Sequence, residues 1–148
     1  MTTIRAIAAE DRADWEPLWA GYLTFYEADI PAETTDTTFA RFLDPAEPLH
    51  GAIARDAEGR AVGLVHWLTH AATWSSAGYC YLEDLYVDPS TRGSGVGRAL
   101  IAHVTDWARE AGSAKVYWLT AEDNATARAL YERVAERSGF IHYQIDLA

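Results

Sequence analysis

Large apolar residues recur along the N-terminal third at spacings that predict one strand and two helices. Residues 3–7 have the character of a short strand. Residues 11–27 carry Trp, Leu, Tyr and Phe at near-helical spacing and predict a helix with an aromatic face. A second, shorter helix is expected over residues 37–43, after a polar loop at residues 28–35.

The middle of the chain predicts antiparallel strands. Residues 51–55 and 61–68 are strand-like runs on either side of the turn cluster at residues 56–59, a pattern typical of a hairpin. A further turn is expected at residues 73–78, followed by a strand over residues 79–87. These runs together predict a meander.

The C-terminal third alternates helices with strands. Residues 98–111 place apolar side chains on one stripe of a helix, which Gly112 ends. Residues 115–120 predict a buried strand, residues 124–137 a helix, and residues 140–147 a final strand.

This order mixes antiparallel hairpins with a parallel crossover, and it predicts an α+β (mixed α/β) fold. We expect a central mixed, mostly antiparallel sheet with helices on both faces. The 148 residues suffice for one domain with a substantial core and are too few for two ordinary ones. We therefore expect a single domain over residues 1–148.

The amino-acid composition limits the kinds of partner and the cellular compartment that are expected. The chain has 12 Lys and Arg against 22 Asp and Glu, a formal net charge of −10, which disfavours nucleic acid and suits cationic partners. The alternative is that the acidic residues only keep the protein soluble. There is a single cysteine, no apolar run near the ~20 residues that span a bilayer, and no apolar stretch at the start typical of a signal peptide. A cytoplasmic protein that does not bind membranes is expected.

A glycine-rich turn is the strongest chemical signal. Residues 92–97, Arg-Gly-Ser-Gly-Val-Gly, lie between the strand at 79–87 and the helix that follows. Glycines allow the backbone to approach a bulky anion, and the first turn of a helix offers free N–H groups and a partial positive charge, so a diphosphate ligand is expected. The dinucleotide fingerprint fails because Arg98 stands at its third glycine, and no Gly-Lys-Ser/Thr follows as in a P-loop.

Three ordered motifs resemble one family. The R-x-x-G-x-G pattern of residues 92–97 is similar to the acetyl-CoA signature of the GNAT superfamily of N-acetyltransferases. Residues 81–87 resemble the preceding strand of its polyamine (spermidine/spermine) branch. Residues 124–131, followed by Gly139-Phe140, resemble its N-x-x-A-x-x-L-Y and G-F segment, with the longer spacing also found in histone- and D-amino-acid-acetylating relatives.

The resemblance implies acetyl-CoA as co-substrate and no metal. It also implies that the strands at 79–87 and 115–120 splay apart at a bulge, with the pantetheine arm of the cofactor between them. The cofactor-binding residues that it implies are Leu85, Tyr86, Val87, Arg92, Gly93, Ser94, Gly95, Val96, Gly97, Arg98, Asn124 and Tyr131.

Acetyl transfer to an amine needs a proton acceptor, because an alkylamine of pKa ~10 is about one part in a thousand neutral at pH 7. Glu83 and Asp84 are adjacent on a strand, so we expect their side chains to point to opposite faces and only one to face the acetyl group. The resemblance favours Glu83 as the base, acting through a water, and Asp84 as a contact for the substrate ammonium. Either residue is alternatively an ordinary strand-face carboxylate.

The resemblance also assigns the remaining steps. Tyr131 is the candidate acid for the departing thiolate, with a core aromatic residue as the alternative. Asn124 is expected to contact the cofactor or to cap a helix, a role that suits asparagine. A backbone N–H near Tyr86 or Val87 would stabilise the oxyanion.

Acceptor contacts are the least constrained by the sequence. Tyr26 and Glu27, at the end of the first helix, are the candidate substrate-binding residues beside Asp84. His66 is expected to be a hydrogen-bonded structural histidine, and the histidines show no zinc-binding pattern. Cys80 is expected to be a packed thiol, which favours direct transfer over a covalent enzyme intermediate.

The sequence therefore predicts an acetyl-CoA-dependent N-acetyltransferase that acts on a primary amine of a small cationic acceptor, a polyamine or an amino-acid-like molecule. The alternatives are acetylation of a protein lysine, as in histones, or of an N-terminal amine, and a non-catalytic acyl-CoA-binding regulator. The six Trp and eight Tyr would suit an interface, and a homodimer is expected.

Overall fold

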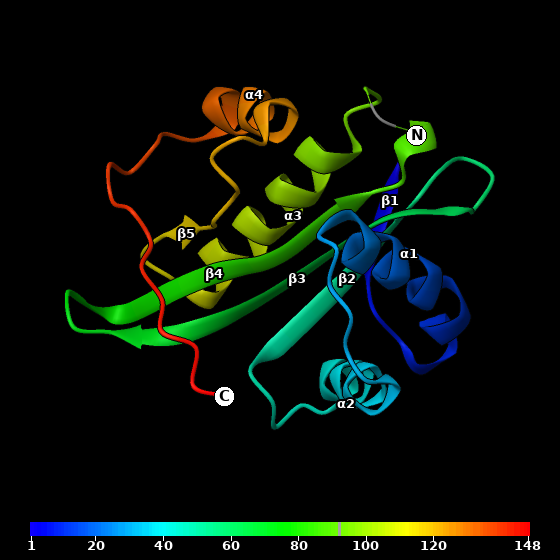
Figure 1. Cartoon of the computed structure of the whole chain (residues 1–148), viewed down its shortest axis with the longest axis horizontal. Coiled ribbons are helices and arrows are strands. Elements are labelled where there is room, and N and C mark those ends of the chain that lie inside the picture. Colours follow the sequence, from blue (N-terminus) through cyan, green and yellow to red (C-terminus); the bar gives the residue numbers. More distant parts are fainter. Residues whose placement is uncertain (92) are drawn as a thin grey trace.

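The computed structural model describes residues 1–91 and 93–148 and contains one mixed sheet with helices packed on it (Figure 1). The sheet order is β1-β2-β3-β4-β5, antiparallel throughout except for the parallel pair β4–β5. The strands are β1 (Thr3–Ala6), β2 (Leu49–Arg55), β3 (Ala61–Ala72), β4 (Ser75–Val87) and β5 (Val116–Tyr117). The α-helices are α1 (Arg12–Phe25), α2 (Ala32–Leu43), α3 (Val96–Ala111) and α4 (Ala125–Val134). The predicted mixed, mostly antiparallel sheet is confirmed.

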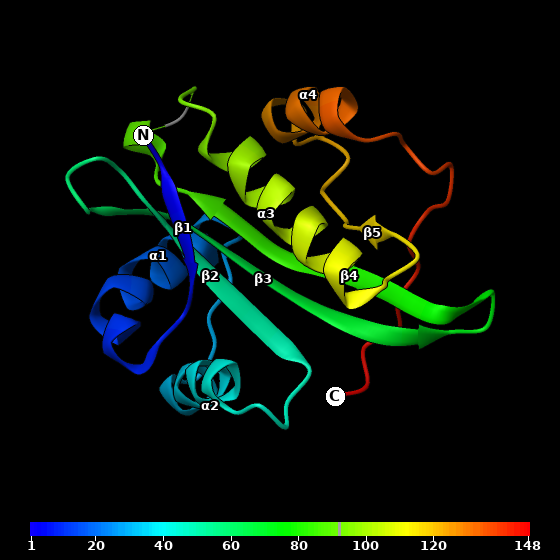
Figure 2. The ribbon, with the colours of Figure 1, turned by 180° about the vertical axis from the view of Figure 1, so that it is seen from behind.

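Helices cover both faces of the sheet, as predicted (Figures 1 and 2). Ile53 and Leu64 pack in one buried cluster with side chains of α1 and α2, whereas Val65 and Trp67 pack in another with side chains of α3. Successive strand residues point to opposite faces, so the same two strands supply both cores. No helix in the described part of the chain is long and apolar enough to span a membrane.

The two central strands separate as the family resemblance implied. β4 and β5 pair only at Cys80 with Val116 and at Tyr81 with Tyr117, while β4 continues to Val87. Most of the strand predicted over residues 115–120 is therefore not paired. The separation leaves the β5-facing edge of β4 without a strand partner beyond Tyr81 among the described residues.

The pairing of β3 with β4 contains a β-bulge at the same level. His66 pairs with Asp84, but the next residue, Trp67, pairs with Leu82. Glu83 is thus the extra residue on β4, and a bulge of this kind bends the strand and re-aims its side chains.

Two predicted boundaries are wrong. The helix expected at residues 37–43 begins at Ala32, inside the predicted loop, because Pro31 (φ −60°, ψ 146°) has the extended conformation that precedes a helix and its missing N–H costs nothing at a helix start. The turn expected at residues 73–78 is shorter, since β3 extends to Ala72 and β4 begins at Ser75.

The strand predicted over residues 140–147 is also wrong. The chain after Val134 contains no strand, and its large apolar side chains are exposed: Phe140, Ile141, Tyr143, Ile145 and Leu147. A strand needs a neighbouring edge for its main-chain hydrogen bonds, and the two residues of β5 offer too short an edge for eight.

Leu100 tests the packing of α3 on the sheet. Its side chain is fully buried in the cluster formed with β3 and β4, so Leu100→Ala should lower the free energy of unfolding by about 2–5 kcal/mol through lost burial and a residual cavity. The matched control is Leu43→Ala at the exposed end of α2, expected to cost about 1 kcal/mol or less. Urea unfolding measures both, and equal losses would contradict this packing.

Candidate functional site

A pocket of about 490 Å³ lies where β4 and β5 separate. It is open to solvent and lined by β4, by the segment that follows β5, by residues of α1 and α4 and the residue after α1, and by the C-terminal segment. Its lining residues are Tyr22, Tyr26, Tyr81, Leu82, Glu83, Asp84, Leu85, Trp118, Leu119, Thr120, Ala121, Tyr131, His142 and Gln144. The described part of the chain contains no group of three or more His, Cys, Asp or Glu side chains arranged to hold a metal ion.

Both carboxylates line this one pocket. The expectation that Glu83 and Asp84 point to opposite faces is wrong, because the bulge at Glu83 interrupts the alternation on which it rested. Their charges interact, because the negative charge of Asp84 raises the pKa of Glu83. The pocket therefore concentrates negative charge on a short segment of β4.

Glu83 has the environment of a proton acceptor. Burial raises the pKa of its carboxyl group, the negative charge of Asp84 raises this pKa further, and a hydrogen bond from Tyr81 lowers it. The pKa of the Tyr81 hydroxyl is itself raised to about 12, first by burial and then by the charge of Glu83. Tyr81 consequently keeps its proton at neutral pH and donates a hydrogen bond to Glu83.

Asp84 is held from behind by side chains of the core. The Nδ1 of His66 lies 2.8 Å from Oδ2 of Asp84, and the indole N–H of Trp15 donates to Nε2 of the same ring over 3.0 Å. His66 is 1% exposed and Trp15 is fully buried. The carboxylate of Asp84 thus has a fixed partner in the core, and on its pocket side it accepts a hydrogen bond from Tyr22.

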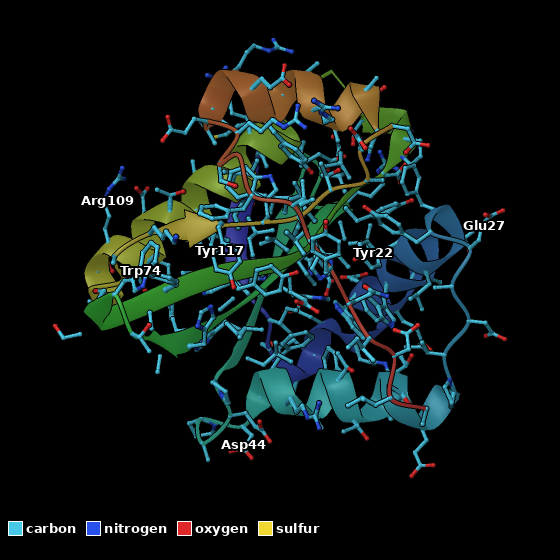
Figure 3. The ribbon with its side chains drawn as sticks, turned by 60° about the vertical axis from the view of Figure 1, so that its left-hand side comes forward. Tyr22, Glu27, Asp44, Trp74, Arg109 and Tyr117 are labelled. Atoms are coloured by element: carbon cyan, nitrogen blue, oxygen red, sulfur yellow. The ribbon has the colours of Figure 1, made fainter. Side chains whose placement is uncertain are left out.

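Tyr22 of α1 and Tyr26, which follows the last residue of α1, complete this side of the pocket. Burial raises the pKa of Tyr22 and of Tyr26, and the negative charge of Asp84 adds to both shifts. Figure 3 shows Tyr22 toward the interior and Glu27 at the outer end of α1. Glu27 is exposed, has a left-handed backbone (φ 53°) and is not among the lining residues.

Tyr131 faces the pocket from α4. Its ring packs edge-on against Trp118, with ring centroids 5.4 Å apart, and burial raises the pKa of its hydroxyl to about 12. Asn124 lies outside the pocket lining and caps the same helix, because its side-chain oxygen accepts a hydrogen bond from the N–H of Ala127. The capping role anticipated for Asn124 is therefore present.

The glycine turn ends at the start of α3 and suits a bulky anion. Gly93 and Gly95 have left-handed backbones (φ 86° and 84°), and an added Cβ at either would meet no heavy atom within 4 Å. At Gly97 an added Cβ would lie 3.3 Å from Leu130 and 3.7 Å from Val87. The first turn of α3 is therefore open to solvent on one side and packed against β4 and α4 on the other.

The other predicted cofactor residues surround this turn. Ser94 and Arg98 are exposed, whereas Val96 is buried in the core beneath α3. Arg92 lies outside the described residues.

Among the lining residues of the pocket, Thr120 has a buried hydroxyl without a described hydrogen-bond partner, which a polar group in the pocket could satisfy.

The end of β4 offers backbone groups to the pocket. Leu85 lines the pocket, while Tyr86 directs its side chain onto Gly21 of α1 and Val87 packs beneath α3. Because the side chains of Tyr86 and Val87 pack against helices, these residues can offer a ligand only main-chain groups. The edge of β4 that faces β5 has no strand partner here among the described residues.

Several lining residues were missed from the sequence. Tyr22 lies four residues before Tyr26 on α1, and this spacing puts the two side chains on one face of the helix. His142 and Gln144 lie in the segment that was expected to be a strand. The position of His66 behind Asp84 depends on the β3–β4 register, for which the sequence has no local signal.

Comparisons with known proteins find one family model and several relatives that match this chain. A model of the acetyltransferase (GNAT) family matches residues 13–135. The D-amino-acid N-acetyltransferase HPA3 of Saccharomyces cerevisiae is 41% identical over 142 residues, which cover 95% of this chain and 88% of that protein. The thialysine N-epsilon-acetyltransferase of Caenorhabditis elegans is 34% identical over 86 residues, which cover 58% of this chain and 52% of that one.

A solved structure supports the fold. The structure of AAC(6')-Iy in complex with the bisubstrate analogue CoA-S-monomethyl-acetylneamine superposes with a TM-score of 0.85 at 21% sequence identity. The match covers 100% of this chain and 99% of that chain.

The environment of Glu83 predicts opposite shifts in two variants. Asp84→Asn removes a negative charge and should lower the pKa of Glu83, whereas Tyr81→Phe removes a hydrogen bond to the carboxylate and should raise it. Carbon-13 NMR of the Glu side chains as a function of pH measures both. Shifts of the same sign in the two variants would contradict the described contacts.

Proposed function

Since the chain belongs to the acetyltransferase (GNAT) family, we propose that it transfers an acetyl group from acetyl-CoA directly to a primary amine of a small cationic acceptor. The observation that carries this proposal is the pocket in which Glu83 and Asp84 lie together beside four tyrosines. Two carboxylates at one site suit a proton acceptor and an anchor for an ammonium group.

The charge of the lining favours a polyamine. The described lining residues include two carboxylates and no Lys or Arg. The amines of a polyamine would therefore find negatively charged partners in the pocket, whereas the carboxylate of an amino acid would find no positively charged one. An amino-acid-like acceptor is the second candidate, supported by the 41% identity to a protein named for D-amino acids. Its carboxylate would have to be accommodated at His142 or Gln144.

In the proposed reaction Glu83 accepts the proton that the ammonium group loses, through a water. The acceptor nitrogen is nucleophilic only when neutral, and at pH 7 it is overwhelmingly protonated. The raised pKa of Glu83 makes it a better proton acceptor than an ordinary glutamate once it is ionised. Asp84 meanwhile holds a positive group of the acceptor.

Tyr131 assists the departure of the CoA sulfur. Its hydroxyl keeps its proton at neutral pH because burial raises its pKa to about 12. Full proton transfer from such a group to a thiolate of pKa ~8.5 is uphill, so we assign Tyr131 a hydrogen bond to the departing sulfur. Main-chain N–H groups at Tyr86 or Val87 would stabilise the acyl oxygen.

The residues around α3 fit the diphosphate of the cofactor. Gly93, Gly95 and Gly97 permit close approach, and the free N–H groups of the first turn of α3 are oriented toward an anion. Ser94, Val96 and Arg98 are proposed to contribute from the same turn, together with Arg92. Acetyl-CoA supplies the acetyl group as an activated thioester.

Direct transfer agrees with the state of the single cysteine. Cys80 is buried, and burial raises the pKa of its thiol to about 11, so it is poorly suited to form an acyl intermediate. A lone free thiol also agrees with a reducing compartment, and the cytoplasm stays our proposed location.

A homodimer is proposed from the C-terminal segment. Ile141, Tyr143, Ile145 and Leu147 alternate along it and are all more than 70% exposed. Such a row of apolar side chains is typical of a surface that a partner covers. Light scattering of the purified chain measures its oligomeric state.

Release of CoA thiol from acetyl-CoA, measured against a panel of polyamines, amino acids, aminoglycosides and lysine peptides, tests the proposed function. Glu83→Gln should lower kcat/KM by about 10²- to 10⁴-fold because the proton acceptor is lost. Tyr131→Phe should lower kcat by about tenfold, through loss of one hydrogen bond to a charged group. Glu33→Gln and Tyr143→Phe, both at exposed positions, are the matched controls and should retain wild-type rates.

The remaining outcomes discriminate the alternatives. Turnover restricted to lysine or N-terminal peptides would favour a protein acceptor. Binding of acetyl-CoA by calorimetry, with no amine acetylated and no effect of Glu83→Gln, would favour the non-catalytic regulator. Absence of acetyl-CoA binding would contradict the proposed function as a whole.

A further inference from the structure

A buried histidine behind the pocket has no role in the reaction as described. His66 lies on β3, is 1% exposed, and bridges Trp15 of α1 to Asp84 of β4. We propose that His66 is a positioning residue: Trp15 fixes its tautomer, and His66 in turn holds the Asp84 carboxylate as the anchor for the acceptor's ammonium group. This inference rests on the proposed function and specifies how the acceptor side of that site is built.

The two hydrogen bonds determine where the imidazole proton is. An indole N–H can only donate, so Nε2 of His66 must accept from Trp15 and carries no hydrogen. A neutral imidazole has one N–H, which is then on Nδ1, 2.8 Å from Oδ2 of Asp84. The contact is a neutral donor to a carboxylate, with its direction fixed by Trp15.

The same arrangement excludes a hydrogen on Nε2. Such a hydrogen would point directly against the N–H of Trp15, and one buried donor would lose its acceptor. The bridge therefore requires the Nδ1–H tautomer, whose one N–H points at Asp84.

The surroundings of His66 restrict its movement. Its ring centroid lies 4.5 Å from that of Phe42 on α2 and 5.4 Å from that of Trp19 on α1. On the β2 side, an added Cβ at Gly51 would lie 3.2 Å from the His66 ring, so glycine leaves room for it. The imidazole is thus packed from three elements and reaches only one carboxylate.

The charged and titratable groups near this bridge are few. Asp84 is the one charged group described in contact with His66, while the neighbours from α1, α2 and β2 are Trp15, Trp19, Phe42 and Gly51. The other groups that interact with Asp84 are Tyr22, Tyr26 and Glu83, which lie on its pocket side. A change in the pocket that follows removal of the Trp15 bond is consequently assigned to the contact between His66 and Asp84.

Two substitutions of His66 separate its two hydrogen bonds. The amide N–H of His66→Asn lies where Nδ1 lies and can still donate to Asp84, whereas the amide oxygen of His66→Gln reaches toward Nε2 and can still accept from Trp15. Loss of a hydrogen bond to a charged group should raise KM for the amine about tenfold in His66→Gln, and His66→Asn should restore most of that loss. KM for acetyl-CoA should stay near the wild-type value in both.

Trp15→Phe tests whether the indole fixes the tautomer. Without the indole N–H, the hydrogen of the neutral imidazole can lie on either nitrogen, and the Nε2–H form cannot donate to Asp84. KM for the amine should then rise, by less than in His66→Gln, while KM for acetyl-CoA stays near the wild-type value. Nitrogen-15 NMR of the imidazole, which needs no turnover, should show the Nδ1–H tautomer in the wild type and a mixture of tautomers in Trp15→Phe.

The possible results distinguish failure of the positioning role of His66 from failure of the proposed function. Equal KM increases in His66→Asn and His66→Gln, or an Nε2–H tautomer in the wild type, would overturn the positioning role. Binding of spermidine, measured by calorimetry in the same variants, makes the comparison without turnover. A wild type that binds spermidine but acetylates no amine of the panel would contradict the proposed function and leave the positioning comparison intact. Spermidine binding that is equal in the wild type and in all the variants would overturn the positioning role and leave the proposed function intact.

Discussion

The register of β3 against β4 is the constraint on which the site depends. It shifts by one residue between His66 and Trp67, so that Glu83 has no partner across the pair. A regular pair would send Glu83 and Asp84 to opposite faces of the sheet. The bulge instead brings both to the pocket that the separation of β4 and β5 opens. One irregular residue thus brings the proposed proton acceptor and the proposed anchor onto a single short segment.

The two carboxylates differ because their surroundings differ. Glu83 is exposed to solvent in the pocket, receives a hydrogen bond from Tyr81, and has a raised pKa. Asp84 contacts the imidazole of His66 through a bond that crosses from the pocket into the core. Neighbouring acids placed in unlike environments are a common way to assign unlike roles in acid–base chemistry. Here the second environment comes from α1 and β3, on the face of the sheet remote from α3.

The parts of the fold that depend on local periodicity could be predicted from the sequence. The stripe of α3, its end at Gly112, and the hairpin of β2 with β3 follow from side-chain spacing and turn residues. The glycine turn and the tyrosine of α4 could also be found, because each is a contiguous motif.

What could not be predicted depends on contacts between distant segments. The bulge at Glu83 is a property of strand pairing, and the bridge from Trp15 to Asp84 joins α1, β3 and β4. The alternation at residues 140–147 is typical of a strand, but β5 is too short to pair with it. The local sequence pattern shows which secondary structure a segment can form. Whether the segment forms it depends on a neighbouring segment with which it can pair or pack.

A crystal structure of the chain with CoA and a bound polyamine would test the central claim most directly. We expect the diphosphate at the first turn of α3, one amine nitrogen within hydrogen-bond distance of the Asp84 carboxylate, and the reacting nitrogen within one water of Glu83. An amine bound away from β4, or Glu83 and Asp84 on opposite faces of the sheet, would contradict the account.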